Sequence, residues 1–95
     1  MKENNETPDI LEVKALDNDL VYLKYETNEE KIYNMEKLIN ENKFYKKLTD
    51  KEYFKKVKPR GDSIEWENGE DVAPESLYYD SVDINEFQGI IKELD

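Results

Sequence analysis

Few residues of this chain could take part in catalysis, because the sequence contains neither histidine nor cysteine. Their absence removes the imidazole base, the thiol nucleophile and the zinc–thiolate site together. Three serines and three threonines offer hydroxyl groups, but none has a histidine to activate it. There is also no glycine-rich phosphate loop and no nucleophile elbow. We therefore expect no enzymatic activity and no cofactor.

Two groups of oxygen-bearing side chains are the remaining candidates for chemistry: Glu65, Glu67 and Glu70, and Asp62, Asn68 and Asp71. Paired carboxylates hydrolyse glycosides, but alternate positions on a hairpin normally form its exposed face, and nothing marks a sugar cleft. The second group lacks the D-x-[DN]-x-[DN]-G spacing of a calcium loop. There we expect a solvated turn, or Asp71 bonded to nearby backbone, and no metal site.

The strongest candidate for a binding surface is residues 43–60, which we call the basic band. This segment holds 8 basic and 2 acidic residues, whereas residues 1–42 hold 5 and 11, and residues 61–95 hold 1 and 11. Its basic residues are Lys43, Lys46, Lys47, Lys51, Lys55, Lys56, Lys58 and Arg60, interleaved with Phe44, Tyr45, Tyr53 and Phe54. Two interpretations stay open: a surface for an anionic partner, or a solvated helix face with its aromatic rings turned inward.

Size and composition predict one domain. The 95 residues are 37% hydrophobic and 40% charged, so the core must rest on few side chains, chiefly the seven Tyr, three Phe and one Trp. A net charge of −10 disfavours independent binding to nucleic acid, whose affinity comes mainly from Lys and Arg. No segment approaches the length of a membrane span, and the amino terminus lacks an apolar signal core. We expect a cytoplasmic protein.

Alternating apolar residues predict an antiparallel meander of three strands. Leu11, Val13 and Ala15 form the first apolar face, and residues 21–25 form the second after an Asp17-Asn18-Asp19 turn. Tyr33 and Met35 continue a third strand. Because these segments are short and closely connected, an α+β fold built on this meander is the economical interpretation.

Two short helical segments should follow, one capped by Asn34 and one opened by a capping box at Thr49 and Glu52. Phe44, Leu48 and Phe54 would then face inward. Next, Ser63-Ile64-Glu65-Trp66 and a returning strand at residues 70–72 predict a Trp-bearing hairpin around Asn68-Gly69. A lone Trp at such a position is more often part of the core than a partner anchor.

The last quarter of the chain predicts two more helices. Pro74 suits the first turn of a helix carrying Leu77 and Tyr78. A C-terminal helix over residues 84–94, capped by Asp83, would show an apolar stripe of Ile84, Phe87, Ile90, Ile91 and Leu94. That stripe packs on the sheet or, if exposed, forms a homodimer or partner face.

The ordered motif Trp66, Asn68-Gly69, Asp71, Pro74 and Leu77-Tyr78, preceded by a Phe44-to-Val57 aromatic pattern, resembles the bacterial family called domain of unknown function 2442. The resemblance covers residues 8–79, so we expect a flexible tail at 1–7, a family core at 8–79 and a helical extension at 80–95. Asn34 stands where the family often has Asp, which keeps a capping oxygen.

The resemblance implies a small α+β domain without established enzymatic activity. Some members precede a helix-turn-helix domain, for which the 16 residues after Tyr79 are too few, and others are encoded beside small proteins in toxin–antitoxin-like pairs. We therefore expect a protein-binding or regulatory module whose partner is another protein encoded nearby. The alternatives are an acidic nucleic-acid mimic that inhibits a DNA- or RNA-binding protein, and a plain scaffold domain.

The contact surface we expect combines aromatic anchors with a rim of basic residues: Tyr45, Lys46, Lys47, Tyr53, Lys56, Arg60 and Tyr79. The family motif residues are expected to be structural instead. They are Trp66, Asn68, Gly69, Asp71, Pro74, Leu77 and Tyr78.

Overall fold

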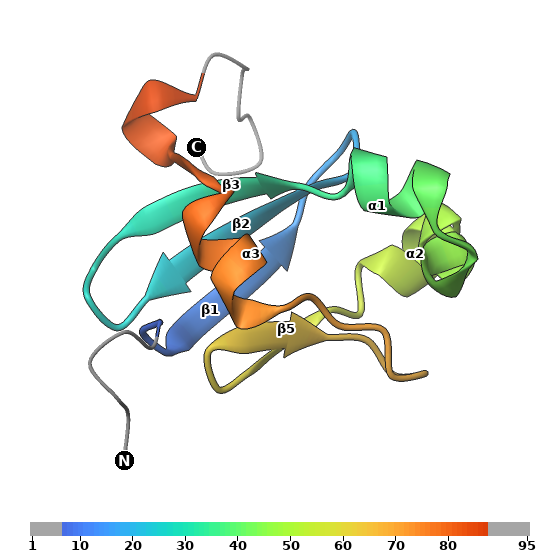
Figure 1. Ribbon diagram of the computed structural model, residues 1–95, viewed down its shortest axis with the longest axis horizontal. Coiled ribbons are helices and arrows are strands. Elements are labelled where there is room, and N and C mark those ends of the chain that lie inside the picture. The colour runs from blue at the N-terminus through green and yellow to red at the C-terminus, as the bar shows by residue number, and fades with distance from the viewer. Residues whose placement is uncertain (1–6, 88–95) are drawn as a thin grey trace.

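Three consecutive strands, β1 (Ile10–Ala15), β2 (Leu20–Tyr25) and β3 (Glu30–Asn34), form an antiparallel meander in this computed structural model, which describes residues 7–87 (Figure 1). A two-residue strand, β6 (Val82–Asp83), pairs antiparallel with β3 and gives the order β1-β2-β3-β6. Asn18 and Asp19, both at φ 63°, make the β1–β2 turn, because Asn and Asp tolerate the left-handed region better than most residues. The predicted α+β meander is confirmed.

A β-bulge changes which residues of β1 face the core. The pairing register shifts between Ile10 and Glu12, so that Leu11 is left unpaired with 62% of its surface exposed. Ile10 is buried in its place. Simple alternation had placed Leu11 with Val13 and Ala15 on the apolar face; that placement is wrong because one inserted residue reverses the alternation.

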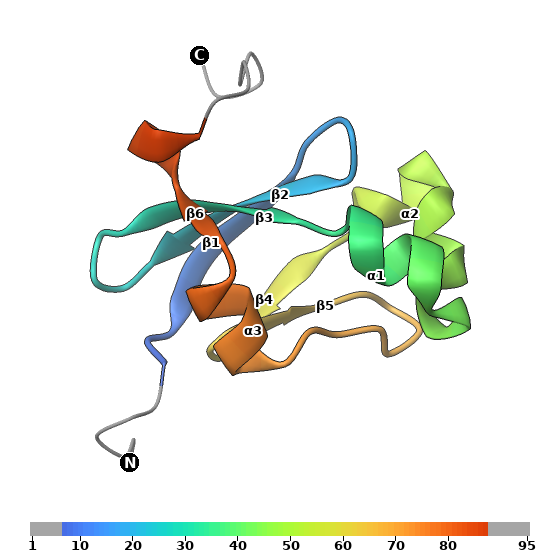
Figure 2. The ribbon, with the colours of Figure 1, turned by 45° about the horizontal axis from the view of Figure 1, so that its top comes forward.

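Three short helical segments, which follow β3, lie beyond one end of the sheet beside the β1–β2 turn (Figures 1 and 2). They are α1 (Glu36–Glu41), the 3₁₀ helix η1 (Lys43–Thr49) and α2 (Lys51–Phe54). The Asn34 side chain accepts a 2.8 Å hydrogen bond from the Glu36 N–H, but the N-cap of α1 is Met35, which makes no side-chain cap bond, so Asn34 lies one residue before the cap position predicted for it. The second cap lies one residue later than predicted: Asp50 accepts from the N–H groups of Glu52 and Tyr53.

Thr49 does not serve as that cap because its hydroxyl donates instead to the carbonyl of Lys46, 2.8 Å away. The hydroxyl is thereby directed back to the preceding helical turn, while the N–H groups at the start of α2 bond to Asp50. Asp50 takes the position, with an extended backbone and a carboxylate that accepts two N–H groups. The predicted helix is present, with its first residue at Lys51.

A second hairpin, β4 (Lys58–Arg60) and β5 (Ser63–Glu65), packs beside β1. The Ile10 N–H donates to the Gly61 carbonyl at 2.8 Å, which ties the hairpin turn to the start of the sheet. The strand predicted to return through residues 70–72 is reduced to a single bridge between Glu65 and Asp71. Asn68-Gly69 does make a turn, closed by a 2.9 Å bond from the Trp66 N–H to the Glu70 carbonyl.

Each face of the sheet buries its own apolar cluster. The main core contains Val21, Leu23 and Tyr25 of β2, together with Trp66 and Leu77, the latter from α3 (Pro74–Tyr79). A smaller cluster of Leu16, Tyr22 and Ile32 lies on the opposite face, against Leu20, Ile84 and Phe87. The alternation of β2 therefore divides its side chains between two cores.

The predicted C-terminal helix is wrong where the structure describes it. Ile84–Glu86 form one 3₁₀ turn, η2, and Phe87 is extended at φ −71° and ψ 127°. The Asp83 side chain accepts from the Asn85 N–H, so the predicted cap is present but opens a single turn. Ile84 and Phe87 pack against the sheet, while Ile90, Ile91 and Leu94 lie outside the described residues.

Within residues 7–87, no helix has both the length and the apolar character that crossing a membrane requires.

Candidate partner-binding surface

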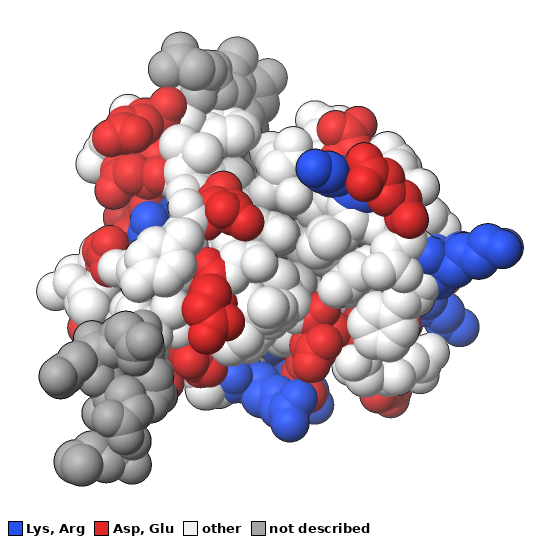
Figure 3. Space-filling model, viewed as in Figure 1, with Lys and Arg blue, Asp and Glu red and all other residues white. Residues whose placement is uncertain are grey.

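The eight basic side chains of the basic band are all exposed. Capping by Asn42 opens η1 and capping by Asp50 opens α2, so the two helices follow each other within one continuous stretch. Figure 3 shows basic side chains projecting at the end of the molecule where these helices lie and at the lower edge, and patches of acidic side chains among uncharged ones across the face in view. The charge asymmetry of the sequence is therefore also an asymmetry of the surface.

The 3₁₀ geometry of η1 decides which of its aromatic rings is exposed. Side chains three positions apart share a face in a 3₁₀ helix, and Tyr45 and Leu48 are both buried. Phe44 lies a third of a turn away and is 53% exposed, resting edge-on against the Tyr45 ring at 5.0 Å. We expected Phe44 to face inward; that prediction is wrong, and an apolar ring instead lies among the lysines.

Tyr45 and Tyr53, which the sequence suggested as partner anchors, have their rings in the main core. The Tyr45 hydroxyl donates to the Asp71 carbonyl at 2.8 Å, and burial raises its pKa. The Tyr53 hydroxyl donates to Glu70 at 2.7 Å and accepts from the Asn68 N–H at 2.7 Å. Burial first, and then the bond to Glu70, raise the Tyr53 pKa. Both side chains are buried, with 9% and 6% of their surface exposed, so neither presents an open aromatic face in this conformation.

Glu70 itself is buried, although the sequence placed it on the exposed face of a hairpin. Its carboxylate accepts the Tyr53 hydroxyl bond, and the turn at Asn68-Gly69 directs it inward rather than along a regular strand. The predicted exposure of Glu70 is wrong because the returning strand on which it depended is not formed.

A shallow cavity of about 280 Å³ brings three predicted site residues together. Lys47, Tyr53 and Lys56 line it with Asn68, Asp50, Glu52 and Glu67. The Lys47 Nζ lies 5.6 Å from the centre of the Tyr53 ring, within cation–π range. Lys46 projects from the same 3₁₀ helix and is exposed. The cavity carries both charges and has no wide apolar floor, which suits a polar rim better than an anchor pocket.

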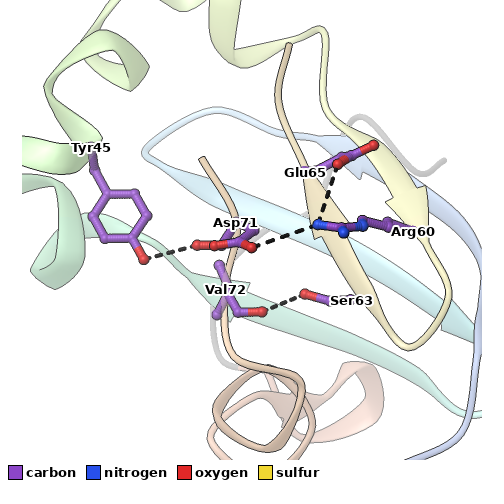
Figure 4. Close-up of polar contacts among 6 residues, drawn as sticks. All are labelled: Tyr45, Arg60, Ser63, Glu65, Asp71 and Val72. Carbon is purple, nitrogen blue, oxygen red and sulfur yellow. Dashed lines mark hydrogen bonds and ion pairs between the residues drawn. The ribbon is translucent and has the colours of Figure 1, made fainter. Parts of the chain in front are cut away.

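Arg60 lies apart from that cavity, on β4, and is exposed. Its guanidinium lies 3.6 Å from Glu65 and 3.8 Å from Asp71, as Figure 4 shows. In the same view, the Tyr45 hydroxyl reaches the Asp71 carbonyl and the Ser63 hydroxyl donates to the Val72 carbonyl. We expected a solvated turn, or an Asp71 carboxylate bonded to nearby backbone. The carboxylate is half exposed and lies beside Arg60 of the neighbouring strand.

Trp66 is in the core, as predicted, with 1% of its surface exposed. Its indole stacks on Phe54 at 5.7 Å, and its N–H donates to the Phe54 carbonyl at 2.9 Å. Pro74 opens α3 and Leu77 is fully buried. Gly69 provides the φ of 101° that its turn requires. These contacts account for much of the family motif by packing and turn geometry.

Tyr78 packs within the fold, whereas the neighbouring Tyr79 is exposed. The Tyr78 ring packs edge-on against Tyr25 at 5.0 Å, and its hydroxyl donates to Glu29 at 2.6 Å. That bond first, and then burial, raise the pKa of Tyr78 to about 12. Tyr79 is 64% exposed at the end of α3, and it does not line the cavity that Lys47, Tyr53 and Lys56 share.

Sequence reasoning missed one feature near the basic band. A cavity of about 290 Å³ lies between the β1–β2 turn and the η1–α2 segment, with apolar residues at its base and both charges at its rim. The Asp17-Asn18-Asp19 turn and Lys51 were each noted separately, but no local signal in the sequence indicates that they share a cavity. Only their approach in the folded chain does so.

The sequence matches the family described as "Protein of unknown function (DUF2442)" over residues 10–83. Because the match spans most of the chain, the protein belongs to this family. It covers every strand, α1 to α3 and the basic band. No curated protein and no solved structure matches the sequence.

Proposed function

We propose that this family member is a non-enzymatic protein-binding or regulatory module whose basic band contacts an acidic surface of another protein. The supporting observation is the exposure of all eight basic side chains of residues 43–60 in a chain whose net charge is −10. Such an arrangement steers an anionic surface toward one end of the molecule and away from the rest.

The exposed Phe44 supplies what a purely ionic surface lacks. Exposed ion pairs contribute only about 0–1 kcal/mol each, so a stable complex needs an apolar contact among them. Phe44 presents 53% of its surface between Lys43 and Lys46. We place it at the centre of the contact, with Lys46, Lys47 and Lys56 at the rim. This replaces Tyr45 and Tyr53, whose rings are buried.

A protein partner fits this surface better than nucleic acid. The 22 acidic side chains outside the basic band would repel a phosphate backbone longer than the band itself, whereas a partner protein can present one local acidic patch. The paired small genes that the family resemblance implies favour a partner encoded nearby, in an antitoxin-like arrangement. Genomic neighbourhood therefore selects the first proteins to test.

The direct experiment is to co-express the full chain with the products of neighbouring genes and to capture it through a tag. A one-to-one complex that survives gel filtration is the expected result. Failure of every neighbour to bind, together with no co-purified protein from the native host, would refute the proposal.

Charge reversal then locates the contact. Lys46→Glu, Lys47→Glu and Lys56→Glu together should weaken the complex by roughly tenfold or more, and Phe44→Ala alone by a similar factor. Lys14→Glu is the matched control, because Lys14 is exposed on β1 outside the basic band. A loss of binding free energy per reversed charge that is as large in the control as in the triple variant would show that net charge, rather than the basic band, governs binding.

Acid-rich surface outside the basic band favours one alternative, inhibition of a nucleic-acid-binding protein by mimicry of its phosphate backbone. Mimicry would use acidic residues and a basic partner, so charge reversal in the basic band would leave affinity unchanged or increase it. The same variants therefore distinguish the two functions, because the sign of their effect is opposite.

A further inference from the structure

The cavity between the β1–β2 turn and the η1–α2 segment has a built apolar base. Leu16, Leu48 and Phe54 line it, and all three side chains are buried in the folded chain. Ala15 and Thr49 complete the wall at the ends of β1 and η1. Its volume of about 290 Å³ is at the lower limit for small-molecule pockets, which suits a ligand of amino-acid size.

The two sides of the rim carry opposite charge. Asp17 and Asp19 lie on the β1–β2 turn, whereas Lys51 and Lys55 lie on α2. Figures 1 and 2 both show this turn beside the helical end of the sheet. Lys55 has only an exposed 3.8 Å contact with Glu52, which a ligand carboxylate could replace at little cost.

The acidic side is held in place by the backbone. The Leu16 N–H donates to the Leu20 carbonyl at 2.8 Å, and the Met35 N–H donates to the Asp19 carbonyl at 2.8 Å. The turn is thus fixed both across its own base and to the start of the helical region. A rigid acidic side opposite flexible lysine side chains can adjust to a small ligand without refolding.

From this arrangement we infer that the cavity binds a free α-amino acid with an apolar side chain. The side chain would lie against Leu48 and Phe54, the ammonium group would face Asp17 and Asp19, and the carboxylate would face Lys51 and Lys55. A residue within a partner protein has no free ammonium or carboxylate group, so its side chain could fill the cavity but would form no ion pair with either side of the rim. The site shares Lys51 and Lys55 with the basic band, but it uses none of the residues placed at the proposed contact, which are Phe44, Lys46, Lys47 and Lys56.

The test is a titration of the ¹⁵N-labelled full chain with L-leucine and L-methionine, followed by amide chemical shifts. We expect saturable shifts confined to residues 15–19 and 48–55, with a dissociation constant on the order of 1 mM or tighter. N-acetyl-L-leucine and L-leucine methyl ester, which each lack one charge, should bind at least about tenfold more weakly. No saturable shift up to about 20 mM amino acid would overturn the inference.

Two further results would also overturn it. N-acetyl-L-leucine amide lacks both charges. If it binds as tightly as L-leucine, the cavity accepts an apolar peptide side chain instead of a free amino acid. Shifts outside the cavity would mean a different site.

Matched variants check the assignment of each charged side. The double variant Asp17→Asn with Asp19→Asn should weaken the binding of L-leucine and leave the binding of N-acetyl-L-leucine, which has no ammonium group, unaffected. The double variant Lys51→Gln with Lys55→Gln should weaken the binding of L-leucine and leave the binding of L-leucine methyl ester, which has no carboxylate, unaffected. Lys43→Gln with Lys58→Gln removes two charges of the basic band outside the cavity and should change neither. Amide spectra of each free variant establish that it is folded, and equal weakening by the control pair would contradict the assignment.

Discussion

Tyrosine hydroxyls bonded to glutamate carboxylates recur in this fold. Tyr22 donates to Glu30 at 2.6 Å, Tyr78 to Glu29 at 2.6 Å and Tyr53 to Glu70 at 2.7 Å. Such charge-assisted bonds are stronger than neutral ones, and the last two join residues that are 49 and 17 positions apart. In a chain without histidine, these pairs link the stability of the fold to pH outside the neutral range.

Replacing Tyr78 by Phe should make the fold less sensitive to acid. The Tyr78 bond first, and the Thr27 bond second, hold the pKa of Glu29 below its ordinary value. A carboxyl with a depressed folded-state pKa stabilises the fold above its unfolded pKa, and this contribution is lost as pH falls through the folded value. Urea unfolding at pH 7 and at about pH 3 measures it: the wild type should lose more stability than Tyr78→Phe.

Acid also protonates the other carboxylates, but it does so in both proteins. The difference between their losses of stability therefore reports the Tyr78–Glu29 bond. Thr27→Val is the graded control, since it removes only the weaker of the two bonds on Glu29. Equal acid sensitivity in the wild type and Tyr78→Phe would show that the Tyr78 bond does not set the pKa of Glu29.

At the scale of elements, the strands were predictable where alternation is uninterrupted. Val21, Leu23 and Tyr25 are all fully buried on one face of β2. Alternation failed at Leu11, because a bulge depends on pairing with the neighbouring strand and leaves no mark in local periodicity. It failed again at residues 70–72, where Glu70 accepts the Tyr53 hydroxyl bond in the interior and the pairing is reduced to the Glu65–Asp71 bridge.

The candidate site was predictable in charge but not in detail. The lysines of the basic band are exposed because nothing in a 37% hydrophobic chain could bury them. Which aromatic ring joins them depends on whether residues 43–49 form an α-helix or a 3₁₀ helix, and a segment of seven residues has too few apolar positions for their spacing to distinguish the two. The cavity at Asp17 and Lys51 was not predictable for a different reason, because it forms only where two segments distant in sequence meet in the folded chain.

The turn after Trp66 should tolerate substitution less well than the turn of the β4–β5 hairpin. Gly69 has φ 101°, outside the left-handed helical region, whereas Gly61 has φ 59°, within it. Neither position has any atom near an added Cβ, so backbone strain alone decides the cost. Gly69→Asn should therefore destabilise the fold by about 1–2 kcal/mol, and Gly61→Asn by less than about 1 kcal/mol. Urea unfolding of both variants is the measurement, and equal losses would contradict the strain argument.

At the scale of the whole molecule, the basic band is a positively charged surface on a protein that is otherwise negatively charged. Residues outside it carry 22 acidic and 6 basic side chains, and their mutual repulsion opposes folding. The attraction that we propose between the basic band and an acidic partner is also electrostatic. Both are screened over a Debye length of about 8–10 Å near physiological ionic strength.

Salt should consequently act in opposite directions on the fold and on the complex. Raising NaCl from about 0.02 to about 0.5 M should increase the melting temperature of the free chain, because screening relieves acidic repulsion. Over the same range the proposed complex should weaken by roughly tenfold or more, because its rim is ionic. Calorimetry of the free chain and binding titrations at matched salt provide the two measurements. A complex whose affinity is indifferent to salt would place the contact on an apolar surface, and the basic band would then be only the solvated face of η1 and α2.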